Sequence, residues 1–132
     1  MKTFNPLVPL VLLIAQSAST QAADLSGAWT VDGSPCDQVF TKENNKLAFK
    51  QDADLHAGGL IVQGKKITGT FQKCTVKSLH DDGSNVKVIA SCSDGVAVSD
   101  VAYDVKFSGE NKMTLSSEKP VPVSMSYVRC SM

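Results

Sequence analysis

Residues 73–93, KCTVKSLHDDGSNVKVIASCS, predict two antiparallel strands joined by a turn. The turn falls at 81–84, where aspartate side chains can hydrogen-bond the backbone and Gly83 can accept a positive φ. One face should be buried, because apolar residues and cysteines share the even positions while polar residues share the odd ones, with Ile89 as the exception. The even set is Cys74, Val76, Val86, Val88, Ala90 and Cys92, and the odd set is Lys73, Thr75, Lys77, Lys87 and Ser91. A hairpin centred on Gly83 would pair Cys74 with Cys92, Val76 with Ala90 and Ser78 with Val88.

A second hairpin is expected directly after the first. In 101–107 the odd residues are apolar and most of the even ones are charged, which is the pattern of a half-buried strand. The next residues, SGEN at 108–111, favour a turn, and apolar and polar residues alternate again after it. This hairpin would pair Phe107 with Met113 and Val105 with Leu115.

The remaining alternation indicates an all-β fold. A change of apolar parity near Gln72 indicates a bulge or a corner in the chain, and no long window shows helical periodicity. We therefore predict a small antiparallel β-barrel of about eight strands, with a two-sheet β-sandwich as the alternative, because alternation fixes faces and not closure. The other strands are expected at 27–31, 38–41, 46–50, 60–63, 66–71 and 123–129.

The four cysteines are expected to form two disulfides, because their number is even and the chain is short. The hairpin register pairs Cys74 with Cys92, which leaves Cys36 for Cys130. In the chain-entropy model these bridges contribute roughly 3 and 4 to 5 kcal/mol. Zinc binding is the alternative, but the sequence has no C-x-x-C pair and neither histidine lies close to a cysteine. We expect no metal.

The N-terminal residues predict export. A basic start, MK, precedes a short apolar run at 7–15 and a small-x-small site, TQA, that favours cleavage after Ala22. The apolar run is well below the ~20 residues that a membrane-spanning helix needs. We therefore predict a signal peptide at 1–22, one domain at 23–132, a periplasmic or secreted location, and no membrane insertion.

The charge pattern gives no sign of a nucleic-acid partner. The chain has 13 basic and 13 acidic residues with their signs interspersed, and Lys65-Lys66 is the only basic doublet. A generic nucleic-acid binder would show a basic stripe. We expect no nucleic-acid partner, and we expect a monomer.

The segment Gly27-Ala28-Trp29 resembles the opening of the lipocalin and avidin group of barrels, in which Gly-x-Trp begins the first strand. The sole arginine, Arg129, is expected in the last strand beside Cys130. In lipocalins an arginine from late in the barrel packs across that tryptophan, and a guanidinium over an indole is a favourable contact. The resemblance implies a stack of Trp29 and Arg129 that closes one end of a barrel. An ordinary core tryptophan and a surface arginine are the alternative.

A second resemblance points to a protein partner. Residues 25–36, LSGAWTVDGSPC, are similar to the start of the small periplasmic inhibitors of bacterial alkaline metalloproteases, which are also small barrels. Those inhibitors carry one disulfide and insert an N-terminal trunk into the protease, whereas cleavage after Ala22 leaves almost nothing ahead of Leu25. The overall pattern is also similar to small uncharacterised exported proteins of Gram-negative bacteria.

One polar cluster could carry chemistry. If 52–56 is extended, Asp52, Asp54 and His56 share a face that could hold a divalent metal. We favour the alternative, a polar loop that runs into Gly58-Gly59 and forms a candidate binding loop. No nucleophile elbow, H-E-x-x-H pair or phosphate loop is present, and the cysteines are expected to be oxidised. We expect neither enzyme activity nor a cofactor.

These observations favour a non-catalytic binding module. It would recognise an exported protein, such as a protease, through loops at 34–35 and 54–59 of a disulfide-locked barrel. The alternatives are a structural or stress-related envelope protein without a specific ligand, and a carrier of a small ligand. A sizeable internal cavity is not expected, because the interiors of small barrels are commonly filled by side chains. The expected filling residues are Trp29, Phe71, Tyr103, Phe107 and Tyr127.

Overall fold

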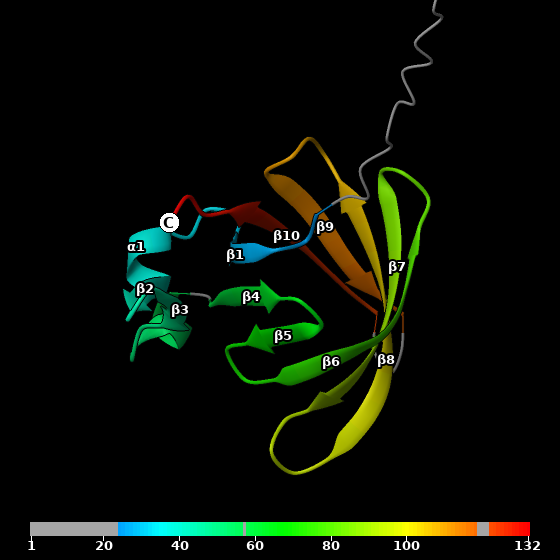
Figure 1. The fold of residues 1–132 in the computed structure, drawn as a ribbon, viewed down its shortest axis with the longest axis horizontal. Helices are drawn as coiled ribbons and strands as arrows, with labels where there is room; N and C mark the ends of the chain where they lie inside the picture. The colour runs from blue at the N-terminus through cyan, green and yellow to red at the C-terminus, as the bar shows by residue number, and fades with distance from the viewer. Residues whose placement is uncertain (1–23, 57, 119–121) are drawn as a thin grey trace, which may run out of the picture.

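The computed structural model describes residues 24–56, 58–118 and 122–132, and eight strands of these segments close into one antiparallel barrel (Figure 1). The predicted barrel is confirmed, and the two-sheet sandwich is excluded. The signal peptide predicted at 1–22 lies outside the described residues. In order around the barrel the strands are β1 (Gly27–Val31), β10 (Val123–Arg129), β9 (Lys112–Ser117), β8 (Val98–Phe107), β7 (Asn85–Ser93), β6 (Lys73–Asp81), β5 (Lys66–Gly69) and β4 (Gly59–Gln63).

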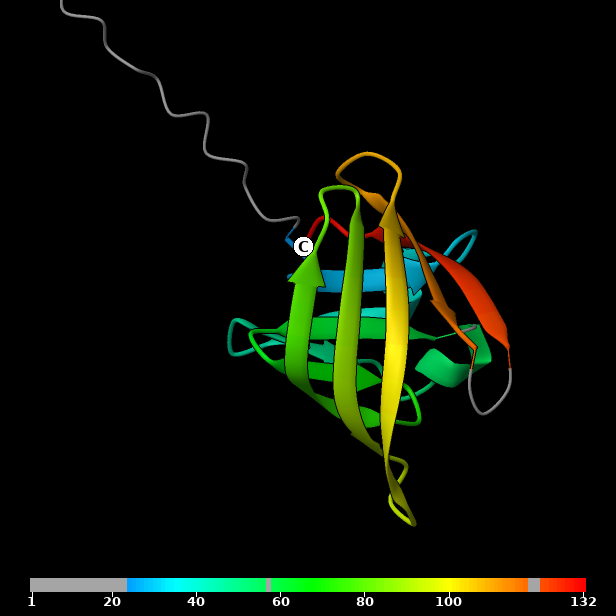
Figure 2. The same cartoon turned by 90° about the vertical axis from the view of Figure 1, so that its right-hand side faces the viewer.

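Long and short strands form different walls of the barrel. In Figure 2 the long strands β6, β7 and β8 stand side by side at the front, and the shorter β1, β4 and β5 cross behind them. From β4 to β10 every strand pairs with the next strand along the chain, and β1 pairs with both β4 and β10 to close the ring. Since all neighbours are antiparallel, the strand ends fall into two sets, one at each end of the barrel.

The hairpin of β6 and β7 has the predicted pairs at its open end but not near its turn. Cys74 lies opposite Cys92 and Val76 opposite Ala90, while the predicted partner of Val88 is wrong, because Leu79 and not Ser78 faces it. A bulge between Val76 and Ser78 takes up one residue of β6. At the turn, the Gly83 N–H donates to Asp81 Oδ1 at 2.8 Å, and Gly83 has a φ of 86°.

The next hairpin and the expected corner are both present. Val105 lies opposite Leu115 and Phe107 opposite Met113, as predicted. The chain turns after β5, where the Gly69 N–H donates to the Gln72 carbonyl at 2.7 Å. Strand β5 therefore ends before Phe71, which sits in the turn with 77% of its surface exposed. The prediction that Phe71 fills the interior is wrong.

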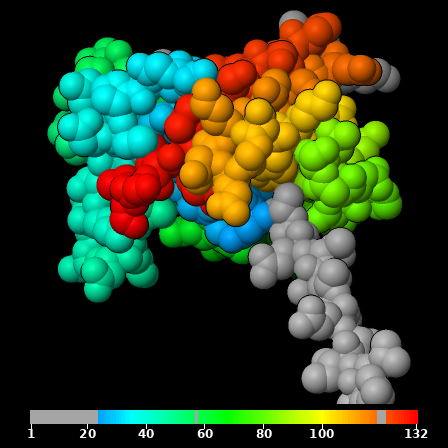
Figure 3. Space-filling model, turned by 90° about the horizontal axis from the view of Figure 1, so that it is seen from above, coloured from blue at the N-terminus to red at the C-terminus, as the bar shows by residue number. Residues whose placement is uncertain are grey.

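Residues 32–56 leave the barrel and pack against its outer side. They form a short helix α1 (Cys36–Val39), a hairpin of β2 (Phe40–Glu43) and β3 (Lys46–Phe49), and a 3-10 helix η1 (Ala53–His56). The strand predicted at 38–41 is therefore half helical. This change of conformation lets the consecutive residues Val39 and Phe40 both be buried, which the alternation of a strand would prevent. In Figure 3 this excursion, coloured cyan to green, lies on one side of the barrel.

The fold has two apolar clusters, and each contains one disulfide. The interior cluster includes Trp29 and the Cys74–Cys92 bridge, whose S–S distance is 2.07 Å. The outer cluster lies between the excursion and the outer face of β1 and β4, and it includes the Cys36–Cys130 bridge, whose S–S distance is 2.08 Å. Both predicted pairings are confirmed. The other buried members of the outer cluster are Ala28, Val39, Phe40, Ala53 and Ile61.

Candidate functional site

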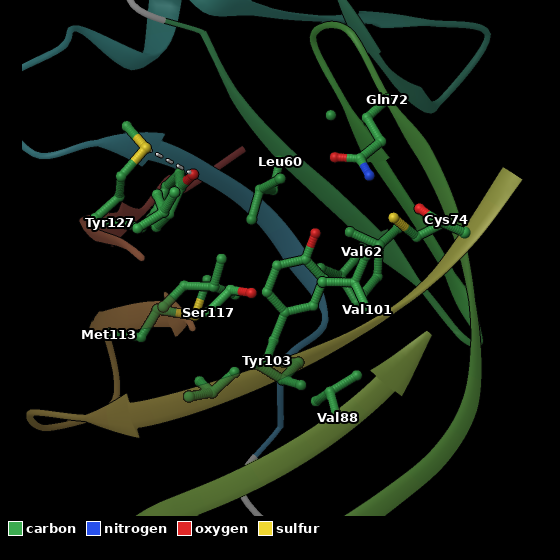
Figure 4. A pocket seen from close by; sticks show the side chains of 18 residues that line it. Leu60, Val62, Gln72, Cys74, Val88, Val101, Tyr103, Met113, Ser117 and Tyr127 are labelled. Carbon is green, nitrogen blue, oxygen red and sulfur yellow. Dashed lines mark hydrogen bonds between the residues drawn. The ribbon is translucent and has the colours of Figure 1, made fainter. Parts of the chain in front are cut away.

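A cavity of about 440 Å³ lies inside the barrel (Figure 4). This volume falls within the ~300–1,000 Å³ typical of small-molecule sites, so the expectation of a filled interior is wrong. Trp29 and Phe107 pack together toward one end, with ring centroids 6.3 Å apart, and Tyr103 and Tyr127 line the space without filling it. The lining residues are Leu25, Leu60, Val62, Ile67, Gly69, Gln72, Cys74, Val88, Ser99, Val101, Tyr103, Val105, Met113, Leu115, Ser117, Val123, Met125 and Tyr127.

One end of the barrel is closed by Arg129 and the segment before β1. The Arg129 guanidinium lies 4.2 Å from the centre of the Trp29 ring, which is the contact that the resemblance implied. Its N–H groups donate to the backbone carbonyls of Asp24, Ser26 and Glu110. The Trp29 indole N–H donates to the Leu25 carbonyl at 2.9 Å. These contacts hold 24–26 across the barrel end, which we call the floor.

The Arg129 guanidinium is held at the floor by its hydrogen bonds, and Arg129 is not one of the residues that line the cavity. Hydrogen bonds from Ser26 lower the pKa of Asp24, and the nearby Arg129 guanidinium lowers it further. The Ser26 N–H donates to Asp24 Oδ1 at 2.8 Å. The floor thus has an ionic and hydrogen-bonded outer side, while its inner side presents Leu25 to the cavity.

The deeper part of the cavity is apolar. Strand alternation turns Val88 of β7 and Val105 of β8 inward, and both are almost fully buried. The outward neighbours of these residues are polar or exposed, so the lining comes from one face of each strand. Other apolar residues of this deep part are Val62, Ile67, Met113 and Leu115.

Polar groups gather toward the other end, which we call the mouth. Ser99 follows the first residue of β8 and Ser117 ends β9, so both lie near the same end of the barrel. Gln72 lies in the turn after β5, and the Tyr103 hydroxyl lies 4.0 Å from Cys92 Sγ, at the level of Ser99. We call Gln72, Ser99, Tyr103 and Ser117 the polar collar; Figure 4 shows Gln72, Tyr103 and Ser117 around the cavity.

Both tyrosines of the lining keep neutral hydroxyl groups. Burial raises the pKa of Tyr103, although a hydrogen bond with the Gln72 side chain acts in the opposite direction. Burial also raises the pKa of Tyr127, and the neighbouring Tyr103 adds to the effect. The Tyr127 hydroxyl already donates to Met125 Sδ at 3.7 Å (Figure 4). The Tyr103 hydroxyl also has a sulfur acceptor, the disulfide-bonded Cys92 Sγ, but at the longer distance of 4.0 Å, so it is the hydroxyl that turns more easily to a ligand.

Three exposed apolar side chains lie at the mouth end of the barrel. Phe71, Val96 and Val98 are 77%, 95% and 72% exposed. Phe71 lies in the β5–β6 turn, Val96 lies in the β7–β8 turn, and Val98 begins β8. Asp94 Oδ1 accepts hydrogen bonds from the N–H groups of Ala97 and Val96, which fix the second turn and lower the pKa of Asp94. We call Phe71, Val96 and Val98 the apolar rim.

The predicted binding loop lies elsewhere. Asp54 and His56 belong to the 3-10 helix η1 and Asp52 directly precedes it, on the outer side of the barrel. Because the segment is helical and not extended, its alternate residues do not share one face as the metal hypothesis required. Within 24–56, 58–118 and 122–132, no three His, Cys, Asp or Glu residues are grouped to hold a metal ion. The role of these residues in binding stays a prediction.

The polar collar was missed in the sequence. Parity places Tyr103 on the inner face with Val101 and Val105, and its predicted place in the interior is confirmed, but its part in a polar collar was not predicted. Ser99, Ser117 and Gln72 come from three separate strand ends, and only the strand order brings them to the same mouth. The sequence also could not show that the inward side chains leave an open space inside the barrel.

No family model, curated protein or solved structure matches this chain. Its function is therefore argued from the barrel and its cavity. The two disulfides are consistent with an oxidising location outside the cytoplasm. Among the described residues, no helix has the length and apolar character needed to cross a membrane.

Proposed function

We propose that the protein is a non-catalytic binding protein that holds a small, largely apolar molecule inside its barrel. The observation that supports this proposal is the cavity of about 440 Å³, in which apolar side chains predominate. The sequence favoured recognition of a protein and left a carrier of a small ligand as an alternative. Because of the cavity, we now propose the carrier first. The resemblance to lipocalin-like barrels, proposed from Gly27-Ala28-Trp29, agrees with it.

Rigidity supports binding in the cavity. The closed ladder of strands and the Cys74–Cys92 bridge in the cavity wall hold the site in shape before a ligand arrives. A preformed site reduces the ordering cost of association, which otherwise offsets much of the gain from contacts. Each ligand methylene transferred from water into such a site contributes about 0.8 kcal/mol.

A fluorescence titration tests the proposal. The probe is N-phenyl-1-naphthylamine, a neutral apolar dye whose emission rises when it leaves water, and we expect saturable binding. Val101→Trp should abolish this binding, because Val101 of β8 lines the cavity and an indole there would occupy it. Ala102→Trp is the matched control, since Ala102 is the next residue of the same strand and is exposed on the outer face.

The control makes the outcome specific to the cavity. Both variants must melt cooperatively, so that lost binding is not lost folding. Equal loss in the two variants, or a dye signal that does not saturate, would refute binding inside the barrel.

Recognition of another exported protein, such as a protease, is the second candidate. The apolar rim favours it, because three exposed apolar side chains at one end of the barrel could contribute to an interaction surface. Substituting Phe71 and Val96 by serine would abolish a protein complex but leave dye binding intact. We also propose a periplasmic or secreted location, which the disulfides support. A monomeric state and the absence of a nucleic-acid partner stay predictions.

A further inference from the structure

The polarity of the cavity changes along its length. The collar groups lie near the mouth, and the deep side chains between them and the floor are apolar, from Val88 and Val105 down to Leu25. A rigid apolar pocket with a few placed polar groups orients a ligand as well as holding it. A molecule with one polar end therefore fits in one direction, with its apolar part against the floor.

The polar groups of the cavity are uncharged. Among the described lining residues there is no Asp, Glu, Lys, Arg or His. Near the mouth, Lys77 Nζ and Asp100 Oδ2 pair at 2.9 Å through half-exposed side chains, and Asp100 alternates with the inward Ser99 and Val101, so it points outward. Asp94 is engaged by its own turn, and Arg129 lies at the opposite end.

An ionic end group would therefore lose water in the collar without finding a counter-ion among the lining residues. Transfer of an unpaired charge out of water is far more costly than transfer of a hydroxyl that finds a hydrogen-bond partner. The Tyr103 phenol can donate a hydrogen bond, and the Gln72 amide can both donate and accept. A hydroxyl, carbonyl or amide end group matches this set.

We infer that the ligand is an uncharged amphiphile, such as a long-chain alcohol, ester or amide, bound with its apolar tail at the floor and its polar end in the collar. This inference rests on the proposed function and adds the chemical class and the orientation of the ligand. Tyr103 is its central contact, because its hydroxyl is the collar group that reaches inward from the middle of a strand.

Displacement of N-phenyl-1-naphthylamine by three molecules with the same tail tests the end group. Dodecanol, dodecanoate and dodecylammonium have chains of the same carbon number and differ in their end group, which at neutral pH is an uncharged hydroxyl, an anionic carboxylate or a cationic ammonium. We expect dodecanol to displace the dye at a concentration at least about tenfold lower than either ion. Equal or tighter binding of an ion would overturn the inference while leaving the proposed function intact.

Two tyrosine variants test the orientation. Tyr103→Phe keeps the ring and should weaken dodecanol binding roughly threefold to tenfold, the effect of one net hydrogen bond. Tyr127→Phe is the matched control, because that hydroxyl donates to Met125 Sδ at 3.7 Å, a closer contact than the 4.0 Å between the Tyr103 hydroxyl and Cys92 Sγ. Its effect should stay below about twofold. Equal effects of the two variants would overturn the assigned orientation.

The two proposals fail differently in this assay. Dye binding that none of the three molecules displaces would overturn the amphiphile and leave an apolar site. Absence of saturable dye binding in the wild-type protein would refute the proposed function itself.

Discussion

Substitution of Arg129 by alanine should destabilise the barrel from its floor. The variant loses a guanidinium 4.2 Å from the Trp29 ring and hydrogen bonds to the carbonyls of Asp24, Ser26 and Glu110. The ring contact contributes about 1 kcal/mol, and each hydrogen bond adds about 1 kcal/mol net. Arg129 is only partly buried, so in the variant water can hydrogen-bond to the freed carbonyls and recover part of this free energy. We therefore expect the free energy of unfolding to fall by about 2–3 kcal/mol.

Urea unfolding followed by tryptophan emission measures this loss directly, because Trp29 is the only tryptophan of the chain. The midpoint of thermal unfolding should fall by about 8–12 °C. Native-state emission should also shift to longer wavelength as 24–26 detaches and water reaches the indole. Lys112→Ala, at an exposed cation near the same end, should change stability by less than about 0.5 kcal/mol. A loss for Arg129→Ala equal to that of Lys112→Ala, with unchanged emission, would refute the role of Arg129 at the floor.

Further predictions concern the cavity wall. Replacing Cys74 and Cys92 together by alanine should cost about 3 kcal/mol, because it opens a loop with a sequence separation of 18; an unchanged urea midpoint would contradict this. Burial raises the folded-state pKa of Tyr103 and Tyr127 above the usual 10.0, because the folded protein favours the neutral phenols. The corresponding part of the free energy of unfolding is fully present below pH 10 and is lost as pH rises through the raised pKa values. The double variant with phenylalanine at both positions should therefore lose less stability above pH 10 than the wild type, and parallel stability curves would show that the phenols do not contribute.

The parts of the fold that depend on neighbouring residues were predictable from the sequence. The alternation around Gly83 was sufficient to pair Cys74 with Cys92, since a hairpin places its partners by local counting. The same counting failed at Ser78, where a bulge adds a residue that alternation does not reveal. The strand predicted at 46–50 is present as β3, but the first half of the strand predicted at 38–41 is helical, because α1 is only four residues long and leaves no helical periodicity in the sequence.

The candidate site was only partly predictable. Parity assigned Tyr103 and Tyr127 to the interior, but whether inward side chains meet across a barrel depends on its radius and on the register of every strand. Phe71 shows the limit clearly, because one turn between β5 and β6 moved a large apolar ring from the expected core to the surface. The contact of Trp29 with Arg129 came from a family resemblance and not from spacing.

The closure of the ring by β1 has a consequence for how this barrel forms and opens. Strands β4 to β10 join to their sequence neighbours, whereas the pairing of β1 with β10 brings together the two ends of the described chain. Strands that are close in the sequence pair early in folding, and strands that are distant pair late. The β1–β10 pairing is therefore expected to form late, and we call it the seam of the barrel. Cys36 follows β1 and Cys130 follows β10, so the bridge with a sequence separation of 94 fastens that seam covalently. After this disulfide has formed, β1 and β10 can lose their hydrogen bonds to each other, but the bridge keeps the two strands close together.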